Sequence, residues 1–430
     1  MSTGFDRDPD EFTRGAKAVV IYPDMGGSSR DSDARLEETA GLALAIGIEV
    51  VERVALRIRA PKPGTLIGSG QVEVLAETVA ARELSLAVFD AALTPVQQRN
   101  LETGLGCKVI DRTGLILEIF GERARTAEGR LQVELAHLDY QAGRLVRSWT
   151  HLERQRGGFG FLGGPGETQI EADRRLIRDR MARLKRELDS VSRTRGLHRE
   201  RRQRAPWPVI ALVGYTNAGK STLFNRVTGA DVMAENLLFA TLDPTLRQIS
   251  LTGIDKAILS DTVGFVSELP TQLVAAFKAT LEEVVSADIL IHVRDIAHPD
   301  TIAQKDDVET VLKEIGVDPA TPRFEAWNKL DLLDGEAREA VLAEAGKRDD
   351  VVAVSALSGE GVAELIEQVA AQLTQGHRRY RIELDPSDGA GAAWLHQHGE
   401  VIEHSVEDGR AIYEVRMAPK DHERFETRGT

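Results

Sequence analysis

Short apolar runs alternate with helical patterns over the first 125 residues of the chain. Ala18–Tyr22 is a continuous apolar run, which predicts a buried strand, and Leu36–Leu44 has the spacing of a helix that follows it. Further strands are predicted at Glu49–Val51, Leu86–Phe89 and Val109–Ile110. Strands that alternate with helices favour a small α/β domain with a mostly parallel sheet.

The apolar spacing changes at Leu131 to alternating steps of four and three residues, the pattern of a coiled coil. Two such seams flank a glycine-rich stretch, residues 156–167, so we expect two helices that fold back antiparallel around a turn at their far tip. The first seam contains Leu131, Leu135, Leu138, Ala142, Leu145, Trp149 and Leu152. The second contains Ile170, Ile177, Met181, Leu184, Leu188 and Val191.

The alternation of strands and helices resumes in residues 209–375. Near the end of the chain, Ala393–Leu395 predicts a helix and Ala411–Val415 a strand. We therefore expect four regions: an N-terminal α/β domain (1–125), the antiparallel hairpin with its tip and a basic linker (126–204), a second α/β domain (205–377) and a small α+β domain (378–430).

Composition narrows the class of protein. The chain of 430 residues has 42% hydrophobic residues, a formal net charge of -14 and one cysteine, Cys107, so it forms no intrachain disulfide. The polar first ten residues do not resemble a secretion signal, and no apolar run is long enough to span a membrane. These features predict a cytoplasmic protein. The negative net charge argues against indiscriminate nucleic-acid binding over the whole surface. It is compatible with a local basic patch, because charges act over a short range in salt.

The apolar strand Val209–Val213 leads directly into a glycine-rich loop that matches GxxxxGK[ST] and precedes a helix. Backbone N–H groups of such a loop, and the positive end of the helix, bind phosphates. We expect Lys220 to contact the β- and γ-phosphates and the Ser221 hydroxyl to coordinate Mg²⁺. The nucleotide-binding residues predicted here are Gly214, Tyr215, Thr216, Asn217, Ala218, Gly219, Lys220, Ser221 and Thr222.

Two later segments are expected to respond to the γ-phosphate. One is DxxG after the strand Ala257–Ser260, formed by Asp261, Thr262, Val263 and Gly264. Asp261 would hold the metal through a water, and the Gly264 N–H would bond the γ-phosphate. The other segment contains Phe239, Ala240, Thr241, Leu242 and Asp243. Thr241 is the expected second magnesium ligand, with Thr245 as the alternative, and Lys220, Thr241 and Gly264 are the predicted catalytic residues.

Base selectivity is predicted from Asn328, Lys329, Leu330 and Asp331, which follow the strand Phe324–Trp327. The Asp331 carboxylate can accept from both N1–H and the exocyclic amine of guanine, and adenine offers neither donor. Asn328 would brace the loop and the Lys329 stem would pack on the base. A further loop of Ser355, Ala356 and Leu357 would contact guanine O6 through backbone N–H groups. The ordered set predicts a hydrolase that converts GTP to GDP and phosphate with Mg²⁺.

The finer pattern resembles the HflX family of ribosome-associated GTPases, which are related to translation factors. The matching segments are Gly214–Thr222, Phe239–Thr245, Asp261–Phe265, Asp111–Thr113, Ile119–Phe120, Arg123–Ala124 and Gly164–Gln169. The resemblance implies an N-terminal α/β domain, a helical hairpin, a GTPase domain and a small C-terminal domain. It also implies GTP-dependent binding to the large ribosomal subunit and its rRNA, the separation of stalled or idle ribosomes, and release on hydrolysis.

Two positions differ from the family pattern. A basic residue is usual before GPGE, where this chain has Gly163 and Gly164, and a lysine is usual at Gln71. Both differences remove positive charge from surfaces expected to meet RNA. An ATP-related activity of the first domain has been considered for the family that this chain resembles. The lone glycine motif at residues 68–70 gives it little support.

The RNA contact is expected at the hairpin, because Arg174–Arg204 contains thirteen lysines and arginines. A solvated helix face paired with nearby acids is the plain alternative. At the tip, Phe159, Phe161 and Leu162 would stack on unpaired bases; a disordered turn is the alternative there.

Several alternatives stay open. The protein could instead be a regulatory switch with a protein effector, or an assembly factor of the large subunit.

Asn217 stands where some relatives bind K⁺, although a structural asparagine explains it equally well. Many GTPases have a glutamine after DxxG, and Phe265 stands there, so we expect slow hydrolysis by the isolated protein and stimulation by ribosomes. A monomer is expected.

Overall fold

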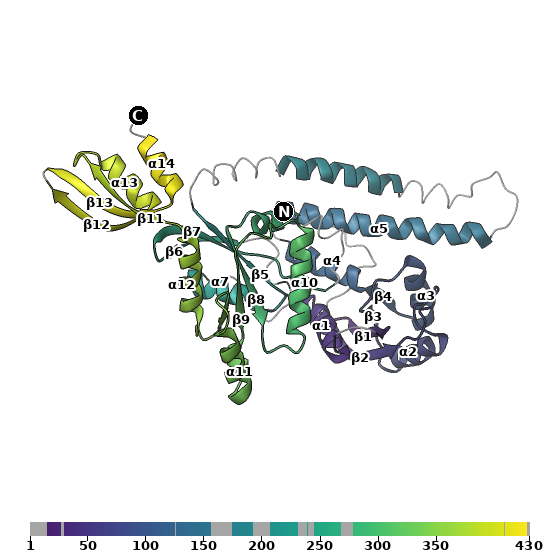
Figure 1. Cartoon of the computed structure of the whole chain (residues 1–430). Coiled ribbons are helices and arrows are strands. Elements are labelled where there is room, and N and C mark those ends of the chain that lie inside the picture. Colours follow the sequence, from purple (N-terminus) through teal and green to yellow (C-terminus); the bar gives the residue numbers. More distant parts are fainter. Residues whose placement is uncertain are drawn as a thin grey trace.

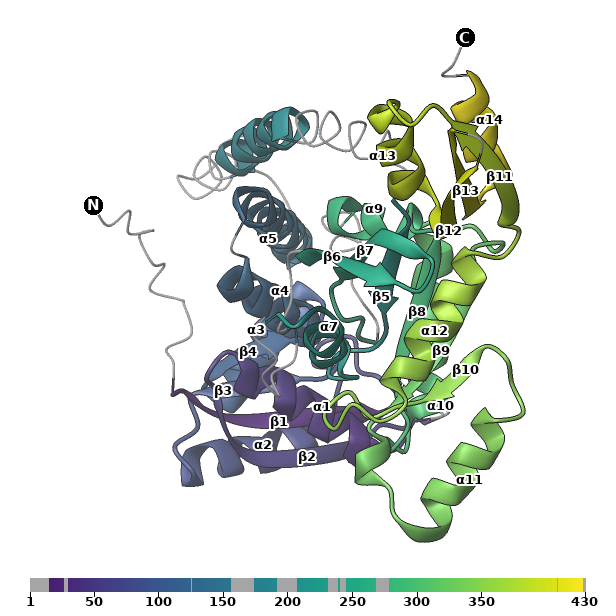
Figure 2. The same cartoon turned by 90° about the vertical axis from the view of Figure 1, so that its left-hand side faces the viewer.

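The computed structural model describes residues 15–26, 30–124, 126–155, 174–191, 207–230, 239, 245–267, 278–407 and 409–427. Three sheets and a long helical hairpin make up this part of the chain (Figure 1). The central six-stranded sheet lies between the N-terminal sheet and the C-terminal sheet, and the hairpin extends along one side (Figures 1 and 2).

The N-terminal sheet has four parallel strands in the order β2-β1-β3-β4. Helices α1 and α4 pack on one face, and α2 and α3 pack on the other. All the strands predicted for this region are present, and the sheet is parallel throughout. The elements are β1 (Lys17–Asp24), α1 (Ser32–Ala45), β2 (Glu49–Arg57), α2 (Ser69–Ala81), β3 (Leu86–Phe89), α3 (Pro95–Leu105), β4 (Lys108–Asp111) and α4 (Arg112–Arg123).

Two helices form the hairpin: α5 (Ala127–Gln155) and the helical residues 174–191, which lie side by side in both views (Figures 1 and 2). An ion pair between Glu134 and Arg180, with 2.7 Å between the charged atoms, joins them. Leu184 is fully buried, and the seam residues Ile177, Met181, Leu188 and Val191 are half-buried. Ile170, the first residue of the predicted second seam, lies outside the described residues. The glycine-rich tip and the basic linker lie outside the described residues.

The base of α5 carries a second apolar stripe that the heptad pattern did not indicate. Val133 and Ala136 are buried in the core that α4 also enters, whereas the seam residues Leu131, Leu135 and Leu138 are half-buried. The hairpin is therefore attached to the N-terminal sheet as well as paired with itself. No helix in the described residues combines the length and the apolarity that a membrane crossing requires.

The central sheet has the strand order β10-β9-β8-β5-β7-β6, with only β6 antiparallel to its neighbour. Helices α7 and α12 pack on one face, and α9 and α10 on the other. Loops after the carboxyl ends of parallel strands meet at one edge, where such sheets bind ligands. The strands are β5 (Val209–Val213), β6 (Thr245–Leu251), β7 (Ile254–Asp261), β8 (Ile289–Asp295), β9 (Arg323–Asn328) and β10 (Val351–Ala353). The helices are α7 (Lys220–Thr228), α9 (Lys278–Val285), α10 (Thr301–Glu314), η1 (Leu330–Leu332), α11 (Gly335–Ala345) and α12 (Val362–Leu373).

The C-terminal sheet is antiparallel in the order β11-β13-β12. Its core includes the buried side chains of Leu395, Val415 and Met417. The elements are β11 (Arg378–Leu384), α13 (Gly389–His398), β12 (Glu400–Glu407), β13 (Arg410–Met417) and α14 (Pro419–Thr427). The predicted fold class, two α/β units with a helical hairpin and a small α+β unit, is confirmed.

One apolar core is continuous between the N-terminal and the central sheets. It contains side chains of α1 and α4 on one side and of α9 and α10 on the other, together with Phe239 and Phe265. The two sheets therefore pack as one body, with the loops at the edge of the central sheet close to α4.

Candidate nucleotide-binding site

The loop after β5 has a backbone that requires glycine at two positions. Gly214 has φ 150°, and a Cβ there would lie 2.2 Å from the carbonyl oxygen of Val293. Gly219 has φ 94°, and a Cβ there would lie 2.2 Å from the side-chain nitrogen of Asn328. The loop can therefore curl tightly against β8 and β9 only because these residues have no side chain.

Lys220 begins α7, and its ammonium group lies along the loop. Nζ donates to the carbonyl oxygens of Gly214, at 3.0 Å, and Tyr215, at 2.7 Å. The residue is only 6% exposed. Burial lowers the pKa of Lys220 to about 8, and the charge of Asp261 opposes this shift. A cation in this position, surrounded by the loop, suits a polyphosphate ligand.

Ser221 and Asp261 form an oxygen-rich pair beside Lys220. The Ser221 hydroxyl donates to Oδ2 of Asp261 at 2.7 Å, and Asp261 is fully buried at the end of β7. Hydroxyl and carboxylate oxygens are the ligands that Mg²⁺ prefers. The described residues contain no group of three or more His, Cys, Asp or Glu side chains that could hold a metal.

The DxxG segment is bonded to the loop after β5. A Cβ on Gly264 would lie 2.9 Å from Cα of Thr216 and 3.1 Å from Nζ of Lys220. The backbone of Phe265 accepts from Thr216 N–H at 2.7 Å and donates to the Gly214 carbonyl at 3.1 Å. The Phe265 side chain is fully buried in the core that joins the N-terminal and central sheets.

Asn328 ties three loops together at the other end of the site. Its amide nitrogen donates to the Ala218 carbonyl at 2.8 Å, and its oxygen accepts from Ala356 N–H at 2.9 Å. The Ser355 hydroxyl donates to Oδ1 of Asp331 at 2.6 Å, which orients that carboxylate. The bracing role predicted for Asn328 agrees with these contacts.

The structure brings together every predicted site residue that it describes, at the carboxyl ends of β5, β7, β9 and β10. Phe239 is buried, and Thr245 is the first residue of β6, opposite Asp261. Asn217 is exposed in a left-handed conformation with φ 58°. Ala240, Thr241, Leu242 and Asp243 lie outside the described residues, so the choice between Thr241 and Thr245 stays a prediction.

Sequence reasoning missed a residue that supports the guanine loop. Arg226, on α7, donates from Nε to the Ala356 carbonyl at 3.2 Å and from its terminal nitrogen to the Leu357 carbonyl. It therefore links the helix after the phosphate loop to the loop expected to contact guanine O6. An arginine in the last turn of a helix is too common to mark such a role in a sequence.

The side chain of Tyr215 was also missed, because it points away from the phosphate loop toward the N-terminal sheet. Its hydroxyl accepts from Ser267 N–H at 2.8 Å and donates to Glu38 at 2.9 Å. The Phe239 ring contacts the Phe120 ring, with 4.6 Å between centroids. Two nucleotide-loop segments therefore contact the N-terminal unit, one through Tyr215 and one through Phe239.

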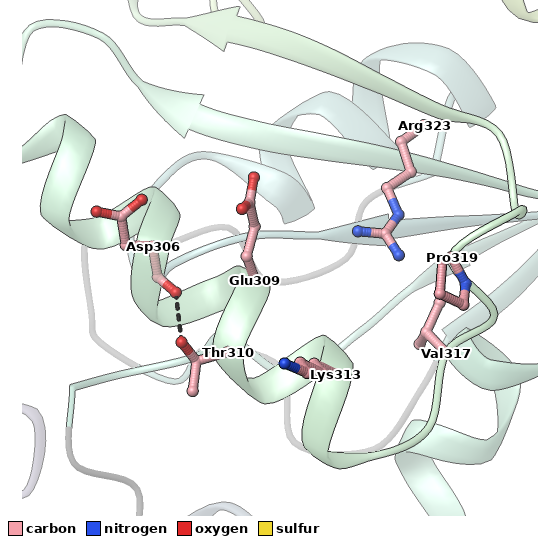
Figure 3. A pocket seen from close by; sticks show the side chains of 7 residues that line it. All are labelled: Asp306, Glu309, Thr310, Lys313, Val317, Pro319 and Arg323. Carbon is pink, nitrogen blue, oxygen red and sulfur yellow. Dashed lines mark hydrogen bonds between the residues drawn. The ribbon is translucent and has the colours of Figure 1, made fainter.

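A shallow pocket of about 440 Å³ lies elsewhere on the central unit. Side chains of α10 line one side, and residues around Pro319 line the other (Figure 3). Its charged side chains are mixed in sign: Asp306, Glu309, Lys313 and Arg323. None of the predicted nucleotide-binding residues takes part, so this pocket is separate from the site.

Comparison with known proteins matches nearly the whole chain. Family models described as GTP-binding GTPase N-terminal, GTP-binding GTPase Middle Region, 50S ribosome-binding GTPase and HflX C-terminal domain match residues 33–121, 123–202, 209–329 and 340–429. GTPase HflX of Magnetococcus marinus is 50% identical over 94% of this chain and 93% of its own length. GTPase HflX of Escherichia coli is 42% identical over 97% of both chains.

A solved structure is also similar: a GTP-binding protein from Sulfolobus solfataricus in complex with GDP. It is 25% identical with a TM-score of 0.45, and the alignment covers 83% of this chain and 99% of that chain. The identities of 50% and 42% to the two bacterial relatives, over almost their full length, establish the family. This chain belongs to the HflX family of GTPases, and it binds and hydrolyses GTP.

Proposed function

We propose that this GTPase binds the large ribosomal subunit and its rRNA in the GTP form, separates stalled or idle ribosomes in the cytoplasm, and leaves when GTP is hydrolysed. The observation that carries the proposal is the match of residues 209–329 to a model described as 50S ribosome-binding GTPase, within a chain related to HflX proteins along its length. The name of that model refers to its members, and the extension to this chain is our inference.

The proposed roles of the site residues follow from the contacts around Lys220. The loop Gly214–Thr222 encloses the phosphates, and Lys220 turns its ammonium from loop carbonyls to the β- and γ-phosphate oxygens. Gly264 N–H bonds the γ-phosphate, next to Lys220. Ser221 and Thr241 would hold Mg²⁺, and Asp261, which accepts from the Ser221 hydroxyl, would act through a water. When bound, the ion neutralises charge that develops on the phosphate oxygens.

Recognition of the base is assigned to the loops after β9 and β10. Asp331 accepts from the guanine N1–H and amine, and the Ser355 hydroxyl keeps its carboxylate oriented. Asn328 braces the loops, the Lys329 stem packs on the base, and the loop Ser355–Leu357 contacts O6. Asn217 is the residue that would bind K⁺, and its exposed side chain is accessible for that role.

The hairpin supports an RNA partner through its charge. Residues 174–191 contain seven lysines or arginines and three acids, in a protein whose net charge is -14. Arg175, Arg178, Arg183 and Lys185 are exposed, and within the described chain they form no ion pair with an acid. This favours a basic surface over a helix face neutralised by its own acids. Contacts between such a surface and phosphates weaken with salt.

Hydrolysis is proposed to be slow until a partner completes the site. The ring of Phe265 is buried, and its position is the one where many GTPases have a water-orienting glutamine. Large subunits should therefore raise the turnover rate well above twofold. Comparing rates in potassium and sodium chloride tests the role of Asn217.

The test mixes purified 70S ribosomes with the protein and a non-hydrolysable analogue of GTP, and resolves them on sucrose gradients. We expect co-migration with large subunits and loss of 70S particles. A protein that stays at the top of the gradient indicates a switch with a protein effector. Accumulation with immature particles in cell extracts, without loss of 70S particles, indicates a role in assembly.

Asp331→Asn supplies the matched control, because it changes only the nucleotide requirement. Its co-migration should need an analogue of xanthosine triphosphate in place of the GTP analogue. Co-migration of either protein without any nucleotide would mean that the basic hairpin simply adheres to RNA, and the proposal would be wrong.

A further inference from the structure

Asp295 ends β8 next to the guanine loop and contacts Lys329. It pairs in register with Asn328 of β9, so its side chain lies at the same sheet edge. Oδ2 of Asp295 is 2.7 Å from Nζ of Lys329, and the two side chains are only 13% and 22% exposed. Oδ1 accepts from Ala297 N–H at 3.1 Å. Both carboxylate oxygens therefore have partners, and the orientation of the carboxylate is fixed.

The backbone of Lys329 is held on both sides. It has a left-handed conformation with φ 67°, and its carbonyl accepts from Leu332 N–H at 3.0 Å. The next residue, Leu330, is fully buried and donates to the Val354 carbonyl at 3.2 Å. The side chain is then the part of Lys329 that keeps its freedom, because a lysine has four rotatable bonds and a strongly hydrated end.

We propose that Asp295 is a positioning residue for guanine-nucleotide binding. It holds the ammonium of Lys329, so that the methylene stem of this lysine is stretched between two fixed ends and forms one wall of the base site before the nucleotide arrives. The proposal rests on the role proposed above for Lys329 beside the base. Because Lys329 is already ordered, less side-chain entropy is lost when the nucleotide binds. The effect should be largest on the rate of nucleotide dissociation.

The pair is sheltered enough for this role. A fully exposed lysine–carboxylate pair contributes little, because water screens the charges and the side chains stay mobile. Here the carboxylate is mostly covered and has a second fixed contact, to Ala297 N–H. The interaction should therefore survive moderate salt better than an exposed pair such as Arg381–Glu407, whose side chains are 58% and 57% exposed.

The experiment is a double-mutant cycle with a fluorescent GDP analogue, in which dissociation rates are measured by stopped flow. The variants are Asp295→Asn, Lys329→Met and the pair. Asparagine keeps an oxygen for Ala297 N–H and loses the charge, and methionine keeps an unbranched apolar stem and loses the ammonium. We expect Asp295→Asn to raise the dissociation rate about 5- to 10-fold in the native background. In the Lys329→Met background the same change should have less than about a 1.5-fold effect.

The matched control is Asp318→Asn. Asp318 also accepts from a backbone N–H two residues on, that of Ala320, at 2.9 Å, but its side chain makes no ion pair with the described lysines and arginines. This variant should leave dissociation unchanged. Binding of inorganic tripolyphosphate, which has no base, should be equal in the native protein and Asp295→Asn.

Two outcomes overturn the proposal: an unchanged dissociation rate in Asp295→Asn, or an equal increase in both backgrounds, which would mean that Asp295 acts through the fold. Failure of the guanine site itself looks different. If the guanine site lies elsewhere, Asp331→Asn also leaves the GDP dissociation rate unchanged, regardless of the rates of the Asp295 and Lys329 variants.

Discussion

Arg112, at the start of α4, donates hydrogen bonds to both the hydroxyl oxygen of Ser267, at 2.8 Å, and its carbonyl oxygen, at 3.3 Å. Ser267 follows Gly264 by three residues, so this contact joins the N-terminal unit to the segment expected to respond to the γ-phosphate. The guanidinium group is fully buried and also bonds Asp90 and Glu38, with 2.5 Å to an oxygen of each. Its charge is compensated by carboxylates of its own unit, and its hydrogen bonds to Ser267 tie that unit to the central one.

Replacing Arg112 by methionine should destabilise the protein strongly. The change leaves the buried carboxylates of Asp90 and Glu38 without one of their cations, and breaking a buried pair costs about 3–5 kcal/mol. Urea unfolding should show this loss as a decrease in the free energy of unfolding. Arg82→Met is the control, because the Arg82–Glu52 pair is exposed and should contribute less than about 1 kcal/mol. Equal decreases in the free energy of unfolding of the two variants would mean that the burial of the Arg112 ion pairs contributes nothing.

Asp331→Asn should exchange guanine selectivity for xanthine selectivity. Aspartate presents two acceptor oxygens to the N1–H and amine of guanine, whereas asparagine presents one acceptor oxygen and one NH2 donor, which suits the 2-oxo group of xanthine. A site built for hydrogen bonds rejects a base that cannot form them by on the order of 10⁴-fold. The Ser355 hydroxyl can still donate to the asparagine oxygen, so the loop should keep its shape. Competition binding with GDP and xanthosine diphosphate measures the exchange. Asp334→Asn, three residues away on an exposed turn, should leave selectivity for GDP intact.

Local patterns account for much of what could be predicted from the sequence. Runs such as Val209–Val213 are strands because their apolar side chains fill both faces of a parallel sheet, and that requirement is visible in composition alone. The heptad spacing that ends at Val191 is likewise a local property, and it identified Leu184 as a seam residue. The nucleotide loops were recognisable because each follows such a strand at a set distance.

Contacts between distant segments were not predictable in this way. The Arg112–Ser267 contact spans 155 positions of the sequence, and it depends on how two sheets pack. An arginine and a serine at those positions have no periodicity that signals burial. The stripe of Val133 and Ala136 was missed for a related reason, because a heptad pattern describes one partner helix and α5 also packs against α3 and α4. Asp295 was not predictable because its contact with Lys329 depends on the register in which β8 pairs with β9.

Gly264→Ala should abolish the response of the DxxG segment to the γ-phosphate. The new methyl group would lie 2.7 Å from Cγ2 and 2.9 Å from Cα of Thr216, and the backbone there cannot move aside without breaking the bonds to Phe265. We expect GDP binding to change by less than tenfold and GTP hydrolysis to fall by more than about 100-fold, as expected when a transition-state donor is displaced. Single-turnover hydrolysis measures the second effect.

Gly121→Ala is the control for that glycine change. Gly121 lies in α4, and a Cβ there would meet nothing within 4 Å. Because alanine favours helix over glycine by about 1 kcal/mol, this variant should be slightly more stable and fully active. Loss of hydrolysis in Gly121→Ala would mean that the assay reports general damage and not the geometry at Gly264.

Nucleotide binding should take up a proton in alkaline solution, because burial lowers the pKa of Lys220 to about 8 from an ordinary value of 10.5. Between these values the unfolded chain holds more protons than the folded one, so the cost of burying this ammonium decreases as pH rises through the window. Phosphate requires the charged form, so the affinity for GDP should fall above pH 8, approaching tenfold per pH unit. Titration calorimetry in buffers of different ionisation enthalpy should detect uptake of roughly 0.8 proton at pH 8.5 and roughly 0.1 at pH 7.

Lys347→Met, which removes an exposed lysine, should keep this uptake, whereas Lys220→Arg should lose it because a guanidinium stays charged. Equal uptake at both pH values would show that another group titrates.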